Sequence, residues 1–115
     1  MSFLKDKKVE IDYLFQIIKD HINENFDLGV ESFDELTVKT RKKPFVHARK
    51  MMMVILSENF GKDYTQKEIA KIFNLDRTSF IHHSKKHIQD YTTYSDYQEE
   101  YDQLRDGFLE KLESK

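Results

Sequence analysis

The chain has 115 residues, 38% of them hydrophobic, so it is long enough to bury one core and too short for two ordinary domains. Nine Phe and six Tyr supply bulky core side chains, whereas three Gly and one Pro provide little of the turn chemistry that a many-stranded β fold needs. The composition therefore predicts one all-α domain over residues 1–115, and the lack of cysteine excludes disulfides and thiolate metal sites.

The net charge of −2 conceals three opposed blocks. Residues 1–38 carry four Lys against nine Asp and Glu (−5), residues 39–89 carry twelve Lys and Arg against four acids (+8), and residues 90–115 carry three against eight (−5). Because charges are screened over about 8 Å at physiological salt, the acidic ends do not cancel the basic middle. The middle is suited to a polyanion, although lysines that merely solvate one helical face would give the same count.

The segment 9–26 has apolar residues at three- and four-residue steps, which predicts a helix with one buried face. The predicted face consists of Ile11, Leu14, Phe15, Ile18, Ile22 and Phe26. The following segment 32–36, SFDEL, predicts a short helix capped by Ser32 with Glu35 at its third position. The N-terminus lacks the apolar core of a secretion signal, and the longest apolar run, 51–56, is too short for a membrane span. We therefore expect a cytoplasmic protein that does not enter a membrane.

A basic loop, VKTRKKP, leads to a predicted central helix over residues 45–60, where Pro44 suits the first turn because its missing N–H needs no partner there. The predicted buried stripe is Phe45, Ala48, Met52, Ile55, Leu56 and Phe60. A triplet of methionines, 51–53, is typical of adaptable binding surfaces, but filling the core is the commoner use and is the one we expect.

Three further helices are predicted after a turn at residues 61–64, which brings the expected number to about six. A short one runs from Thr65, which forms a capping box with Glu68, to Phe73. The next runs from its cap Asp76 to Tyr91. Its predicted buried residues are Phe80, Ile81, Ser84 and Ile88. The last begins with a capping box of Ser95 and Gln98 and is predicted to bury Tyr97, Tyr101, Leu104, Phe108 and Leu112.

Only two or three residues join the helix ending at Phe73 to the one starting at Asp76, which predicts a helix-turn-helix. In that motif the start of the second helix reads base edges in the major groove. Arg77 can donate two parallel bonds to guanine, Thr78 can meet a base edge, and Asp76 can accept from an exposed amino group. Ser79 suits a phosphate. The polar face continues, mostly off the apolar stripe, through His82, Lys85, Lys86 and Gln89.

The segments TRKKPFVHARKMMMVIL and QKEIAKIFNLDRTSFIHHSKKH resemble the C-terminal DNA-binding domain of the bacterial replication initiator DnaA, a Trp-repressor-like helix-turn-helix. That family shows a basic loop, a helix with alanine and arginine, a short E-I-G-type helix and a D-H-T-T signature opening the recognition helix. The corresponding stretches here read RKK, HARK, EIAKIF and DRTS, and the resemblance spans roughly residues 11–112.

The resemblance implies binding of double-stranded DNA, with Arg41 of the basic loop in the minor groove and the signature residues 76–79 in the major groove. It further implies that Lys42, Lys43, Arg49 and Lys50 contact or approach phosphates and that Lys67 lies near the groove. The sequence departs from the family in three places: Arg77 replaces the usual histidine, Asn74-Leu75 replaces glycines, and the turn after the central helix is about two residues longer. The preferred DNA site is therefore left open.

No phosphate-binding loop of the form GxxxxGK[ST] is present, so the chain resembles the origin-binding module of DNA replication initiation without its ATPase. We expect no enzyme activity, no catalytic residue, no metal and no cofactor. His83 and His87 lie four residues apart, but two ligands do not complete a metal site, and the acids and hydroxyls lack a nucleophile elbow. We expect the chain to act as a monomer.

The main alternative is a helical adaptor, or regulator of replication or transcription, that keeps this fold but has lost DNA affinity. Its acidic terminal helices would then bind a replication or regulatory protein. The retained pairing of Arg41 with residues 76–79 favours DNA. Tyr91, Tyr94, Tyr97 and Tyr101 would suit single-stranded bases, but their acidic surroundings disfavour this and Tyr97 and Tyr101 match the core pattern.

Overall fold

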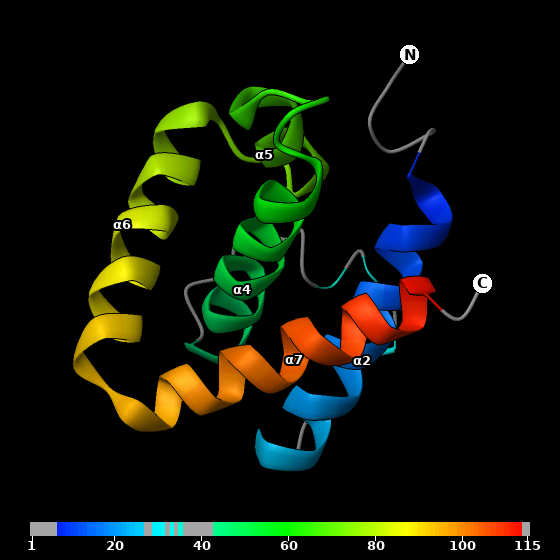
Figure 1. The fold of residues 1–115 in the computed structure, drawn as a ribbon, viewed down its shortest axis with the longest axis vertical. Coiled ribbons are helices and arrows are strands. Elements are labelled where there is room, and N and C mark those ends of the chain that lie inside the picture. Colours follow the sequence, from blue (N-terminus) through cyan, green and yellow to red (C-terminus); the bar gives the residue numbers. More distant parts are fainter. Residues whose placement is uncertain (1–6, 27–28, 32, 34, 36–42, 114–115) are drawn as a thin grey trace.

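Helix α4 (Lys43–Phe60) lies at the centre of the fold in the computed structural model of the protein, which describes residues 7–26, 29–31, 33, 35 and 43–113. Around it lie α2 (Lys8–Phe26), α5 (Gln66–Ile72), α6 (Arg77–Thr93) and α7 (Ser95–Glu113). Helices α2, α5 and α6 pack against α4, and α7 closes the assembly by packing on α2 and α6 (Figure 1). No strand occurs in these ranges, so the prediction of an all-α fold is confirmed for them.

Five helices are described where about six were expected. Residues 32, 34 and 36 of the predicted short helix lie outside the described residues, so this prediction stays untested. None of the described helices combines the length and the hydropathy that a bilayer span requires.

The core is built around the middle of α4, where every residue from Ala48 to Leu56 is buried. A helix enclosed on several sides by other helices buries its whole circumference and not one stripe. This explains why Met51, Met52 and Met53 are at most 1% exposed although consecutive residues point in different directions, and it confirms their predicted role in the core. Pro44 is the second residue of α4, within its first turn as predicted.

The prediction that Phe26 and Ile88 are buried is wrong, because their exposed fractions are 45% and 61%. Phe26 is the last residue of α2, where the helix ends. On α6 the buried face is formed by Phe80, His87 and Asp90, so Ile88, next to His87, points outward. Polar residues occupy this face because they find partners inside the protein, as described below.

The predicted cap of the last helix is also wrong, because Ser95 is already the first helical residue of α7. The N–H of Gln98 donates to the carbonyl of Tyr94 at 3.1 Å. Tyr94 is therefore the C-cap of α6 and the single residue between α6 and α7. The predicted buried face of α7 is confirmed for Tyr97, Tyr101, Leu104 and Phe108, whereas Leu112 is half-buried.

Candidate nucleic-acid interface

The start of α5 is fixed by the predicted capping box. The Thr65 hydroxyl accepts a hydrogen bond from the Glu68 N–H at 3.2 Å, and the Glu68 carboxylate accepts one from the Thr65 N–H at 3.0 Å. These hydrogen bonds, the backbone one first, lower the pKa of Glu68 below its usual value. Two amides that the helix leaves unpaired are thereby satisfied, so residue 66 is held as the first helical position.

The end of α5 is a Schellman motif, which sets the direction of the chain into α6. The Asn74 N–H donates to the Lys71 carbonyl and the Leu75 N–H donates to the Ala70 carbonyl, both at 3.1 Å. Asn74 has φ 58°, the left-handed conformation that glycine adopts most readily and asparagine tolerates. Asparagine can therefore end the helix here without a glycine, and Leu75 packs against the core.

The start of α6 is capped by Asp76, whose carboxylate accepts from the Ser79 N–H at 2.8 Å. This confirms the predicted cap and gives the Asp76 carboxylate a structural role at the site where a base contact was predicted. Arg77 and Thr78 follow directly and are exposed, whereas Ser79 is half-buried. The first turn of α6 thus presents two side chains to solvent directly after the cap.

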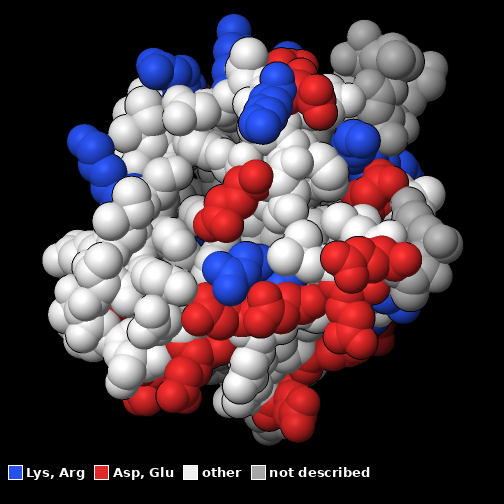
Figure 2. Space-filling model, in the orientation of Figure 1, with Lys and Arg blue, Asp and Glu red and all other residues white. Residues whose placement is uncertain are grey.

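A hollow of about 340 Å³ lies where α5 meets the start of α6. Its lining consists of Lys67, Lys71, Leu75, Asp76, Arg77 and Thr78. Figure 2 shows Lys and Arg side chains along this edge of the molecule and Asp and Glu gathered over α7. Three cationic side chains and one capping carboxylate make the hollow electropositive.

Lys71 was not among the predicted site residues. It lies four positions after Lys67 on α5, and residues at that spacing share one helical face. The spacing was therefore a signal available in the sequence. Further along α6, His82 and Lys85 are exposed as predicted, on the side away from the buried Phe80 and His87.

A second cationic hollow, of about 570 Å³, lies between α4 and α6 at the end of α2. It is lined by Phe26, Lys43, Val46, His47, Lys50, His83 and Lys86. Lys43 is exposed at the first position of α4, so it stays available for phosphate. Burial, and then the charges of Arg49 and Lys50, lower the pKa of His83, which keeps this imidazole neutral at physiological pH.

Arg49 and Lys50 are placed differently from the expectation that they approach phosphates, because they are only 5% and 6% exposed. The Lys50 ammonium lies 2.8 Å from Asp90, which also pairs with Lys86 at 3.1 Å, and it lies 4.6 Å from the centre of the Tyr97 ring. Burial alone would raise the pKa of Asp90, but the hydrogen bonds from the two lysines outweigh it, so the pKa is lowered. Lys50 thus joins α4 to α6, and we leave Lys50 and Arg49 out of the candidate interface.

Arg41 and Lys42 lie outside the described residues, so the predicted minor-groove contact has no structural counterpart to report. The described candidates are therefore Lys43, Lys67, Lys71, Arg77, Thr78, His82 and Lys85.

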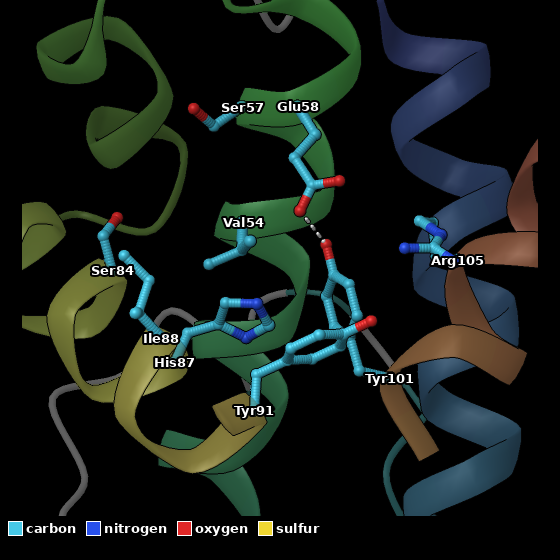
Figure 3. A pocket seen from close by; sticks show the side chains of 9 residues that line it. All are labelled: Val54, Ser57, Glu58, Ser84, His87, Ile88, Tyr91, Tyr101 and Arg105. Carbon is cyan, nitrogen blue, oxygen red and sulfur yellow. Dashed lines mark hydrogen bonds between the residues drawn. The ribbon is translucent and has the colours of Figure 1, made fainter. Parts of the chain in front are cut away.

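A third hollow, of about 370 Å³ between α4, α6 and α7, brings serine, histidine and glutamate side chains together (Figure 3). The Tyr101 hydroxyl donates to Glu58 at 2.6 Å, and the His87 Nδ1 bonds the Tyr97 hydroxyl at 2.7 Å. Burial is the main cause of the lowered pKa of His87. Neither Ser57 nor Ser84 bonds the imidazole, so the residues drawn in Figure 3 contain no histidine-activated serine.

No three His, Asp or Glu residues of the described ranges are grouped so that they could hold a metal ion. The chain matches no protein-family model, and comparisons with curated proteins and with solved structures give no significant match.

Proposed function

We propose that the chain binds double-stranded DNA, with α5 and α6 acting as a helix-turn-helix and the start of α6 entering the major groove. The observation that carries this proposal is the electropositive hollow in which Lys67 and Lys71 of α5 face Arg77 at the start of α6. The resemblance of the sequence to the DNA-binding domain of a replication initiator supports it, and the proposed role is that of an origin-binding module.

The local geometry agrees with such a motif. The Schellman motif at Asn74 and the cap at Asp76 leave residues 73–76 between the helices and fix the angle at which α6 begins. An α-helix with its side chains is about 10–12 Å across, which matches a major groove of about 12 Å. The exposed Arg77 and Thr78 would then meet base edges.

Each exposed residue has a distinct proposed role. Arg77 donates a bidentate pair to guanine, a contact worth about 1–3 kcal/mol of discrimination against a wrong base. Lys67 and Lys71 hold phosphates beside it, and Lys85 continues this grip along α6. Asp76 orients the helix by capping it.

The first experiment selects duplexes from a random pool and then measures affinity for the selected duplex against salt. Because each neutralised phosphate releases counterions, log K should fall with log salt by about 0.9 per phosphate contacted. A slope of several units supports the proposal. Failure to enrich any sequence, together with no salt-dependent binding, refutes it and favours the adaptor.

Three matched variants then separate the roles. Arg77→Ala should reduce the preference for the selected duplex over an unrelated one, whereas Lys67→Ala and Lys43→Ala should weaken all duplexes about equally and reduce the salt slope by about one. Lys8→Ala is the control, because Lys8 is an exposed cation on α2, on the far side of α4 from α6 (Figure 1). Equal losses in Lys8→Ala and Lys67→Ala would show that only total charge matters and would refute the assigned interface.

A further inference from the structure

A separate hollow of about 680 Å³ lies where the end of α2 meets the corner between α6 and α7. Four of its lining residues are the carboxylates Asp90, Asp96, Glu99 and Glu100, and its lining contains no Lys or Arg. Its electrostatic character is therefore opposite to that of the hollow at the start of α6, and Figure 2 shows that Asp and Glu side chains also gather over α7.

Two of these carboxylates are already compensated inside the protein. Asp90 pairs with Lys50 and Lys86. Glu100 is bonded by the Nε2 atoms of His21 and His47, one on each oxygen. Burial alone would raise the pKa of Glu100, but the hydrogen bonds from His47 and His21 outweigh it, so the pKa is lowered and the group stays ionised.

The other two carboxylates are exposed: Asp96 lies in the first turn of α7, and Glu99 lies three residues further along the helix. They make no ion pair or hydrogen bond with any residue of the described ranges. Among the described residues, the hollow thus carries a negative charge that no ion pair neutralises, and a DNA backbone would be repelled from it.

Exposed aromatic rings border the same hollow. Phe26 at the end of α2 and Tyr94 at the α6–α7 corner are 45% and 58% exposed, and both line it. They are two of the four large hydrophobic residues exposed among those described. Aromatic rings beside carboxylates attract guanidinium and ammonium groups, because the ring quadrupole and the carboxylate charge both favour a cation.

We propose that this hollow docks a basic segment of a partner protein, with an Arg or Lys side chain held between the Phe26 and Tyr94 rings and the carboxylates of Asp96 and Glu99. Charge complementarity selects this occupant, because the lining offers two carboxylates that have no partner among the described residues and contains no Lys or Arg. Phe26 and His47 also line the cationic hollow beside Lys43, and the two carboxylates without a described partner lie on α7. The docking surface goes beyond the proposed function, since it would let the protein recruit a partner while the start of α6 remains on DNA.

The test selects peptides from a displayed library of random twelve-residue sequences against the whole chain and measures the affinity of the selected peptides by fluorescence polarisation. The selected peptides are expected to carry Arg or Lys. The double variant Asp96→Asn with Glu99→Gln and the single variant Tyr94→Ala should each weaken their binding, the double variant by roughly tenfold. The control, Glu110→Gln with Glu113→Gln, removes two exposed carboxylates of the same helix outside the hollow and should leave affinity unchanged.

Selection of peptides without basic residues, or equal losses in the control and in the double variant at Asp96 and Glu99, would overturn the proposal. Sedimentation of the wild type as a dimer that this double variant dissociates would also overturn it, by assigning the hollow to a second copy of the chain. Circular dichroism and duplex affinity are measured on the same variants and should be unchanged. If the wild type binds the selected peptides but no duplex, the proposed function fails and this inference stands.

Discussion

Lys50 offers a sharp test of whether a lysine of the basic block supports the core or contacts DNA. Its ammonium lies 2.8 Å from Asp90, and the two side chains are only 8% and 10% exposed. Removing one partner of a buried ion pair typically costs about 3–5 kcal/mol, because the other charge is left uncompensated. Asp90 retains Lys86, which is 57% exposed, so we expect Lys50→Met to cost less, roughly 2–3 kcal/mol.

The matched control is Lys86→Met, which removes the exposed partner of the same carboxylate and should cost less than about 1 kcal/mol. Urea unfolding followed by circular dichroism gives both free energies at pH 7. Folded Lys50→Met protein, titrated with the selected duplex, should keep the wild-type salt slope. Equal destabilisation by the two substitutions, or a slope reduced by about one in Lys50→Met, would refute the structural assignment of Lys50.

The same ion pair predicts how stability depends on pH. The pKa of Asp90 is lower in the folded protein than its unfolded value of about 3.9, so its stabilising effect is complete above that value. The effect is lost as pH falls through the lower folded pKa. The free-energy difference between the wild type and Asp90→Asn should therefore be constant from about pH 5 to 7 and shrink below about pH 4, as measured by urea unfolding. A difference that grows toward acid would contradict the ion pair.

Three local features predict changes in the free energy of unfolding that urea midpoints can measure. Gly61→Ala should cost about 1–3 kcal/mol, because a Cβ at Gly61 would overlap the Ser57 carbonyl oxygen, whereas Gly107→Ala, with open space in the interior of α7, should stabilise by up to about 1 kcal/mol. At the left-handed Asn74, Asn74→Val should cost roughly 1–2 kcal/mol and Asn74→Gly should be nearly neutral. Asp76→Ser should preserve stability within a few tenths of a kcal/mol, whereas Asp76→Ala should cost about 1 kcal/mol; equal effects would exclude capping as the role of Asp76.

The features that the sequence predicted well depend on residues close together in the chain. The capping box joins Thr65 to Glu68 and the cap joins Asp76 to residue 79, each across three positions. Such contacts follow from local geometry and need no knowledge of the tertiary fold.

The errors arose where burial depends on partners far away in the sequence. His87 is buried because its imidazole bonds Tyr97 on α7, and Asp90 is buried because Lys50 reaches it from a helix forty residues earlier. The hydropathy pattern predicted that Ile88 is buried. Instead, the hydrogen-bonded side chains of His87 and Asp90 lie on the buried face of α6, and Ile88 is exposed. No periodic pattern in the sequence encodes such an ion pair, so Lys50 was grouped with the other cations of residues 39–89 that were expected to approach phosphates.

The burial of Arg49 and Lys50 reduces the number of cations in the block 39–89 that lie on the surface. These two cations of the block 39–89 are buried, so among the described residues the cationic surface of this block is left to the start of α4, to Lys62 in the turn after α4, to α5 and to α6. The molecule measures 36 × 33 × 27 Å, several times the screening length of about 8 Å. Acidic side chains over α7 therefore do not cancel the field at the start of α6, and a chain with a net charge of −2 can present a cationic surface at the start of α6 and an acidic one at the corner between α6 and α7.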